Sequence, residues 1–344
     1  MTEGAVPDVS GLGHEFAAAT FDDGGLLLHL PSGNYFQLDA DSGAVWTALL
    51  SCSSTELAVA SVAERLRVPA SRAQALVGGA MASAAALDRR APTGLPRFHE
   101  DEQTLTVRQD DTVALSFDKG SCVLAVGVGL RGASDERISD ALRIFAPKIF
   151  ARWCGLALHA SAVELNGRGV LFSGDSGAGK TTTARVLAQH SPQGRALCED
   201  VAVIAEGDGK AAILDGAEAA IQDWLSTATD TLVTRRSERV TVEPLRRALL
   251  ALDARSPVQK IVFLDRSRRR GQTWSLRPLS RAAALGLLFR HSFMYSAEGV
   301  ILRNHLQTCR DVVALISAAE AVAIPAGVAA LESMGADQIE TIAS

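Results

Sequence analysis

The first part of the chain combines short apolar runs with stretches of helical periodicity. Residues 26–30 and 35–38 are strand-like runs joined by Pro31-Ser-Gly-Asn34, a composition typical of a hairpin turn. Apolar residues at helical spacing then predict three helices, which begin after Asp39, at Ser54 or Thr55, and at Ser71. A hairpin followed by three helices predicts a small winged-helix α+β domain.

Prolines and a glycine interrupt the periodicity at residues 91–96 and mark a linker. We therefore expect one domain at 14–92, a linker at 93–100 and a second domain at 101–344. The second domain begins with strand-like runs at 104–109, 112–117 and 122–128. A helix is expected from Ser134, and Pro147 is expected to kink or divide it. From Leu156 onward strands alternate with helices, which is typical of an α/β layer fold.

A glycine-rich loop lies between a strand predicted at 169–173 and a helix predicted at 181–189. The loop reads Gly174-Asp-Ser-Gly-Ala-Gly-Lys180-Thr181, the phosphate-binding P-loop pattern in the context that the pattern requires. Lys180 is expected to reach the β- and γ-phosphates, and the Thr181 hydroxyl to bind Mg²⁺. ATP and Mg²⁺ are the predicted cofactors. The expected nucleotide-binding residues are Gly174, Asp175, Ser176, Gly177, Ala178, Gly179, Lys180, Thr181 and Thr182.

The Mg²⁺ ion also needs a carboxylate, and the residues alone offer two candidates. Glu199-Asp200 follows the loop helix closely, after Arg195-Ala-Leu-Cys198. Asp265 ends the apolar run Ile261-Val-Phe-Leu264, which looks more like the usual second strand of a P-loop ATPase. The two candidates predict different enzymes.

Composition limits the classes of function. Of the 344 residues, 47% are hydrophobic and 21% charged, which allows a sizeable core. A net charge of −5 argues against nucleic acid as the main partner. The five cysteines include no C-x-x-C pair, as is typical of a reducing compartment. Neither a signal peptide nor an apolar run of ~20 residues is evident. We expect a cytoplasmic protein that binds neither nucleic acid nor a membrane.

Taken together, His159-Ala-Ser161, the loop at 174–181 and Glu199-Asp200 resemble the HPr kinase/phosphorylase superfamily. The resemblance covers about residues 155–205. It implies an α/β P-loop kinase fold, related to phosphoenolpyruvate carboxykinases, that phosphorylates a serine hydroxyl. It also implies that His159 lies beside the phosphates and that Glu199 and Asp200 share Mg²⁺ binding and general-base duties, with Asp200 as the base. Glu199 stands where that family commonly has Asp, and no Gly-Arg-Asn-type substrate signature is found, so the acceptor stays open.

About residues 20–90 resemble the PqqD-like family of peptide-recognition domains. The resemblance rests on Asn34-Tyr-Phe-Gln-Leu38, on Asp41-Ser-Gly-Ala-Val-Trp46 and on the helices that follow. It implies that the leader of a precursor peptide adds as a strand to the hairpin edge and packs against a helix. The winged-helix shape also suggests DNA binding, but the region has no basic recognition helix.

The two resemblances together predict an ATP-dependent kinase that phosphorylates a serine of a ribosomally made precursor peptide. The N-terminal domain would capture the leader of that peptide. In this two-domain organisation the chain resembles the peptide-tailoring kinases of lasso peptide pathways. Three alternatives stay open. They are a kinase for another protein or a small molecule, a nucleotide-binding chaperone that presents the peptide, and an ordinary ATPase that uses Asp265. A homo-oligomer is compatible with the sequence.

Several arginines have no fixed role at this stage. Arg266-Ser-Arg-Arg-Arg270 lies between two strand-like runs and predicts either a solvated hairpin turn or a clamp for an acidic peptide or a triphosphate. Arg290-His291 and Arg303 are similar candidates.

Overall fold

The N-terminal unit is a three-stranded antiparallel sheet with helices on one face. The computed structural model describes residues 9–87, 97–109, 112–207, 209–253, 255–265, 275–292, 299–316 and 318–323. The sheet order is β1-β2-β3. The elements of this unit are α1 (Leu12–Glu15), β1 (Phe16–Phe21), β2 (Gly24–His29), β3 (Tyr35–Leu38), α2 (Ala40–Ser51), α3 (Thr55–Leu66) and α4 (Ala70–Ala85).

The expected hairpin and three helices are confirmed, and the helix caps explain where the helices begin. Asp39 caps α2 by accepting from the backbone N–H of Ser42, and Ser54 caps α3 by accepting from that of Leu57. Strand β1 was not predicted. Its alanines have low strand propensity, and the segment forms a strand because it pairs with β2.

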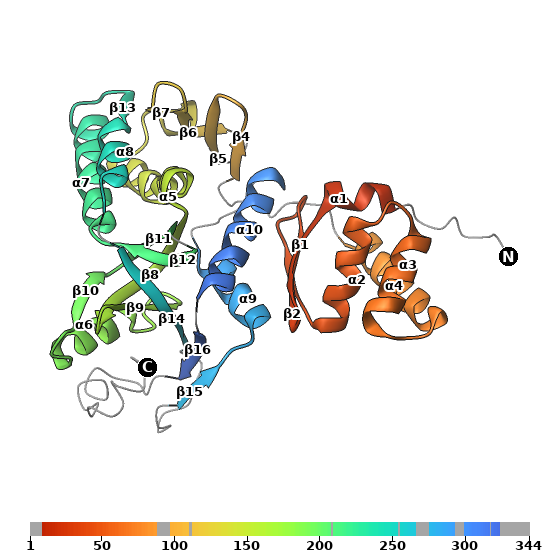
Figure 1. Ribbon diagram of the computed structural model, residues 1–344. Helices are drawn as coiled ribbons and strands as arrows, with labels where there is room; N and C mark the ends of the chain where they lie inside the picture. Colours follow the sequence, from red (N-terminus) through yellow and green to blue (C-terminus); the bar gives the residue numbers. More distant parts are fainter. Residues whose placement is uncertain are drawn as a thin grey trace.

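Both faces of the N-terminal sheet contribute to a hydrophobic core, mainly along β1 and β2. Phe16, Leu27 and Leu38 point toward α2–α4, in a cluster with Trp46 and Val62. The alternate positions join the core of the second unit, where α9 (Arg281–His291) and α10 (Gly299–Leu315) cover the sheet. These positions are Ala17, Ala19, Leu26, Leu28 and Leu30. Figure 1 shows the two helices in blue between the red N-terminal sheet and the central strands.

The second unit begins with a smaller antiparallel sheet of order β13-β7-β6-β5-β4. Its strands are β4 (Arg97–Glu100), β5 (Thr104–Gln109), β6 (Thr112–Asp118), β7 (Val123–Val126) and β13 (Arg239–Thr241). Three helices lie nearby, α5 (Asp135–Cys154), α7 (Ala217–Thr229) and α8 (Glu243–Leu250). One expectation is corrected, since the last four residues of the expected linker form β4. Helix α5 runs through Pro147, which excludes a division of the helix at that residue. The rest of the linker lies outside the described residues.

The larger sheet carries the P-loop. Its strands are β8 (Leu156–Leu165), β9 (Arg168–Gly174), β10 (Arg195–Cys198), β11 (Val201–Gly207), β12 (Lys210–Leu214), β14 (Arg255–Asp265), β15 (Ser275–Pro278) and β16 (Ala318–Ala323). Strand β14 runs parallel to β9 and to β16, and the other pairings are antiparallel. Five of these strands form a closed ring, in which each strand pairs with the next. The order around the ring is β8, β9, β14, β12, β11 and back to β8.

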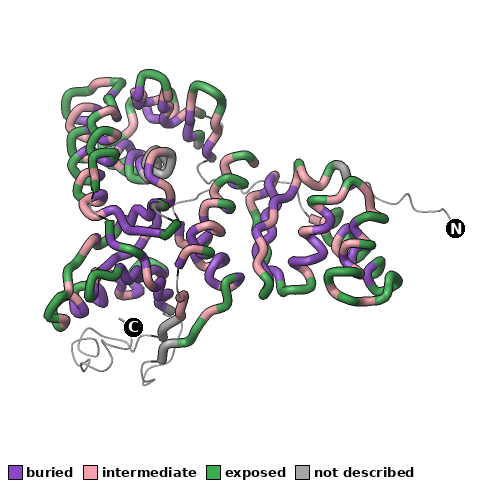
Figure 2. The backbone as a smooth tube through the Cα atoms, in the orientation of Figure 1, coloured by how far each residue is buried: buried purple, intermediate pink, exposed green. Residues whose placement is uncertain are grey.

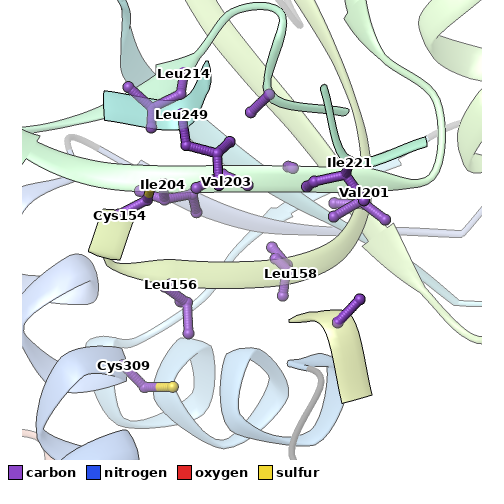
Figure 3. Close-up of a cluster of buried hydrophobic side chains, with 14 of the residues drawn as sticks. Cys154, Leu156, Leu158, Val201, Val203, Ile204, Leu214, Ile221, Leu249 and Cys309 are labelled. Carbon is purple, nitrogen blue, oxygen red and sulfur yellow. The ribbon is translucent and has the colours of Figure 1, made fainter. Parts of the chain in front are cut away.

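Helices cover the larger sheet on both sides. Helix α6 (Lys180–His190) packs on the face that carries Val163, Phe172 and Val262. The opposite face meets α9 and α10, and Figure 3 shows Leu156 of β8 pointing toward Cys309 of α10. Figure 2 shows buried residues concentrated along these strands. No helix among the described residues has the length and apolar character to span a membrane.

Truncation of Leu28 tests the shared core. Leu28 is fully buried where the N-terminal sheet meets the second unit, so Leu28→Ala is expected to lower the free energy of unfolding by about 2–5 kcal/mol. Leu57→Ala, in the same unit, removes a side chain that is 55% exposed and is expected to cost under about 0.5 kcal/mol. Urea unfolding measures both values, and equal losses would show that the sheet face is not part of the core.

Candidate functional site

The P-loop adopts a conformation that its glycines make accessible. Gly174 ends β9 at φ 155°, where an added Cβ would lie 2.7 Å from the Leu264 carbonyl oxygen of β14. Gly179 has φ 96° in the left-handed region and is the N-cap of α6. The strand before the loop and the helix after it are thus confirmed. Residues 175–177 are exposed at the loop apex, where an incoming phosphate would meet the helix N-terminus.

The Lys180 side chain lies inside the loop, bonded to two backbone carbonyl groups. Its ammonium donates to the carbonyl oxygens of Gly174 at 3.1 Å and Asp175 at 3.2 Å. Only 6% of the residue is exposed. Burial lowers the pKa of the Lys180 ammonium, and the charges of Asp200 and Asp175 oppose that shift. A buried ammonium with only neutral carbonyl contacts can move to phosphate oxygens at little cost.

The acidic pair lies directly across β8 from His159-Ala-Ser161. Strands β10 and β11 both run antiparallel to β8, with Cys198 opposite Ala162 and Val201 opposite His159. Glu199 and Asp200 therefore form a bend between two strands that share one neighbour. A register shift precedes the bend, and irregularities of this kind re-aim side chains beside active sites.

A single carbonyl oxygen connects the P-loop helix to this bend. The Glu199 carbonyl accepts the Thr181 hydroxyl at 3.0 Å and also the Ser161 hydroxyl. Ser161 is fully buried and lies 3.3 Å from the Thr181 hydroxyl. Because the Thr181 proton points at a carbonyl, the lone pairs of its oxygen are left for a cation. Ser161 thus positions the predicted Mg²⁺ ligand, a role that sequence reasoning did not assign to it.

Asp200 is paired with His159. The Nδ1 atom of His159 lies 3.0 Å from Oδ1 of Asp200, and the Asp200 side chain is 62% exposed. The hydrogen bond from His159 lowers the pKa of the Asp200 carboxyl, and the charges of His159 and Lys180 add to that shift, which desolvation opposes. An exposed, ionised carboxylate whose partner is a histidine can accept a proton from an acceptor hydroxyl.

Glu199 faces a different partner. Both of its carboxylate oxygens accept from the Arg185 guanidinium of α6, at 2.6 to 3.0 Å. This two-pronged pairing is the strong geometry for arginine and a carboxylate. The two acidic side chains are therefore divided, Asp200 toward His159 and Glu199 toward Arg185. The contact of Glu199 with Arg185 was not predicted from the sequence.

Glu218 is a further residue that sequence reasoning missed. It lies in the first turn of α7, and its carboxylate accepts three consecutive backbone N–H groups of the acidic bend. The distances are 2.7 Å to Glu199, 2.7 Å to Asp200 and 2.9 Å to Val201. Bonds to a charged acceptor contribute more than neutral ones, so Glu218 holds the shape of the bend.

The end of α9 also reaches the P-loop. The Arg290 guanidinium lies 3.3 Å from Asp175 Oδ1, and His291 Nδ1 lies 4.0 Å from the same atom. The His291 ring is mostly buried and stacks on Phe263. Of the arginines left open by the sequence, the structure thus brings Arg290 to the loop. Arg303 instead donates to the Gly13 carbonyl of the N-terminal unit.

The rival carboxylate ends the neighbouring strand. Leu264 pairs with Gly174 in the parallel β9–β14 register, so Asp265 follows one residue beyond the start of the P-loop. The side chain of Asp265 and the segment Arg266–Arg270 lie outside the described residues, and their assignments remain predictions.

The residues present fit a magnesium nucleotide. The described residues contain no cluster of three or more His, Cys, Asp or Glu side chains that could hold a metal alone. A magnesium ion in a nucleotide site needs only one or two protein oxygens, because phosphates and water complete its coordination. The Thr181 hydroxyl, which donates to the Glu199 carbonyl, and the carboxylate of the next residue, Asp200, supply such oxygens.

Comparison with known proteins adds little to this geometry. No family model and no curated protein matches the chain. Among solved structures, the chain is similar to the Hpr(Ser) kinase/phosphatase from Coxiella burnetii, at 14% sequence identity and a TM-score of 0.23. The match covers 54% of this chain and 92% of that chain. A similarity at this level assigns neither fold nor function, so function is argued from the site itself.

Replacement of Glu218 tests the acidic bend. In Glu218→Gln one carboxylate oxygen becomes an NH₂ group that opposes a backbone N–H, so we expect the Mg²⁺ concentration for half-maximal nucleotide binding to rise about tenfold, equivalent to ~1.4 kcal/mol. The matched control is Glu243→Gln, in the first turn of α8, where the carboxylate accepts from the guanidinium groups of Arg246 and Arg247. An equal effect in both variants would contradict the role of Glu218.

His291 predicts a pH dependence of stability. Burial lowers the pKa of the His291 imidazole from 6.5, against the opposing charge of Asp175 and with help from Arg290, Lys180 and His159. The unfolded chain binds more protons just below pH 6.5, so stability should fall as pH drops through that value toward the lower folded pKa. Urea unfolding between pH 7 and 5 should show a shallower loss in His291→Gln. A loss of unchanged slope would exclude His291 as its source.

Proposed function

We propose that this protein is an ATP-dependent kinase that transfers the terminal phosphoryl group to a side-chain hydroxyl. Three features of the site carry the proposal: the Lys180 ammonium inside the loop, the Thr181 hydroxyl on the Glu199 carbonyl, and the Asp200–His159 pair at the same bend. The Asp200 carboxylate is exposed to solvent, so an acceptor hydroxyl can approach it directly. Phosphoryl transfer depends mainly on positioning and charge stabilisation, which these groups supply.

In the proposed reaction the acceptor oxygen attacks the γ-phosphorus and the bond to the β–γ bridging oxygen breaks, so that ADP leaves. The proton of the acceptor hydroxyl goes to the Asp200 carboxylate, and His159 holds that carboxylate in place by its Nδ1–H bond. Lys180 moves from its carbonyl contacts to the β- and γ-phosphate oxygens. A magnesium ion supplies charge neutralisation when bound, and Thr181 and Asp200 would hold it.

Arg290 completes the proposed site. Its guanidinium is 56% exposed and already lies beside the loop, paired with Asp175. A guanidinium at this place can bind the equatorial oxygens of the transferred group, where negative charge is spread in the transition state. Glu199 is left with a positioning role, because Arg185 engages both of its oxygens.

The proposed acceptor is a serine of a ribosomally made precursor peptide, and the N-terminal unit is its recognition domain. Strand β3 supports this part of the proposal, since it is an outer strand of its sheet and pairs only with β2 among the described residues. Tyr35 and Phe36 on this strand are 39% and 37% exposed. An outer strand with exposed aromatic side chains suits the addition of an extended peptide.

Phosphorylation of candidate precursor peptides tests the function. Full-length protein with Mg²⁺ and ATP should add phosphoryl mass to a serine of a peptide that carries its leader. Lys180→Ala and Asp200→Asn should lower the rate at least ~100-fold, because each removes a group that acts in the transition state. Asp265→Asn should retain most activity.

The remaining outcomes separate the alternatives. Loss of transfer in Asp265→Asn but not in Asp200→Asn would favour an ordinary P-loop ATPase. Hydrolysis of ATP with peptide bound but unmodified would favour a nucleotide-dependent chaperone. Transfer that is indifferent to the leader would favour a kinase for another protein or a small molecule.

A further inference from the structure

Helix α9 joins the N-terminal sheet to the nucleotide site. Between the charged residues at its two ends the helix is apolar, and Ala282, Leu285 and Phe289 are among its buried residues. A helix of this composition must be covered all round. The N-terminal strands cover one side, and β8, β9 and β16 of the larger sheet cover the other.

Two polar contacts hold the first turn of α9 against the N-terminal sheet. The backbone N–H of Ala282 donates to Asp23 Oδ1 at 3.3 Å. The positive end of the helix dipole also stabilises a carboxylate at this position. The Ala282 carbonyl accepts from the Gln37 side-chain amide at 2.8 Å. The same amide donates to the Gly25 carbonyl at 3.0 Å, so Gln37 links the helix to the sheet backbone.

A glycine in the middle of α9 permits this approach. A Cβ on Gly286 would lie 2.3 Å from Oε1 of Gln37, so no larger residue leaves the amide where it is. Glycine inside a helix costs ~1 kcal/mol relative to alanine. Contact of α9 with the N-terminal sheet offsets that cost, which explains the presence of glycine at this position.

The last turn of α9 contacts both units within three residues. The Phe289 ring meets the Tyr35 ring of β3 edge-on, with centroids 5.3 Å apart. The next two residues, Arg290 and His291, lie against Asp175 of the P-loop. The ion pair of Arg290 and Asp175 is exposed on both sides, and such pairs contribute little on their own. The position of Arg290 must therefore come from the packing of its helix.

We infer that the N-terminal sheet is a structural part of the nucleotide site, because it fixes α9 and thereby places Arg290 beside the terminal phosphates. Gln37 and Tyr35 are positioning residues that act through Arg290. This second role of the N-terminal unit goes beyond peptide capture, since it operates on the nucleotide with no peptide present. The unit would then be more than a tether that raises the local concentration of a substrate.

Nucleotide affinity of the full chain, without peptide, tests the inference. The probe is a non-hydrolysable ATP analogue with Mg²⁺, titrated calorimetrically. Tyr35→Ala and Gln37→Ala should weaken its binding about fivefold to tenfold. Tyr35→Phe keeps the ring contact and should stay within about twofold of the unmodified protein. The control Leu57→Ala removes an exposed side chain of α3 and should leave affinity unchanged.

A double-mutant cycle separates positioning from general destabilisation. Arg290→Ala alone should weaken analogue binding, and Tyr35→Ala should add nothing in that background, because its effect passes through Arg290. Additive losses, or unchanged affinity in Tyr35→Ala, would overturn the inference. Failure to phosphorylate any peptide would count against the proposed function but would leave this result standing, since no peptide enters the assay.

Gly286→Ala provides an independent variant that changes no residue of the N-terminal strands. The added methyl group displaces the Gln37 amide from α9 while raising the intrinsic helix propensity. Weaker analogue binding in a variant that still unfolds cooperatively in urea would support the inference. Affinity equal to that of the unmodified protein would oppose it.

Discussion

The register of β8 is the constraint on which both the core and the nucleotide site depend. Its side chains alternate between two environments, so that Leu156 and Leu158 pack toward α9 and α10 while His159 and Ser161 lie on the side of α6. A slip of one residue would reverse every side chain and bury the histidine in the apolar cluster. Three neighbouring strands, β9, β10 and β11, pair with β8 and prevent that slip. The geometry of the site is therefore inherited from hydrophobic packing.

Three carboxylates gather at the acidic bend beside the P-loop, and each is compensated separately. Glu199 pairs with Arg185, Asp200 with His159, and Glu218 with backbone N–H groups. Without such partners their repulsion would oppose the entry of a triphosphate. Of these three carboxylates, Asp200 is the one that pairs with a histidine, the side chain most often used in proton transfer. The division of tasks between the acidic residues thus follows from their partners.

Local signals in the sequence predict much of this fold. Caps such as Asp39, Ser54 and Ser134, together with the P-loop, depend on neighbours only a few residues away. What the sequence could not yield is non-local. Strand β1 depends on β2, and Glu218 reaches the acidic bend only after α7 has packed. One non-local feature does have a signal in the sequence. Three consecutive leucines in β2 indicate a strand that is buried on both faces.

The covering of the N-terminal sheet by α9 and α10 also imposes an order in time. The ribosome completes β3 roughly 250 residues before it completes α9, which at ~5–20 residues per second is about 10–50 s of synthesis. During that interval α2–α4 can pack on their face, but the face that carries Leu26 and Leu28 has no partner yet. This apolar surface is the part of the nascent chain that needs protection from aggregation until the C-terminal helices emerge.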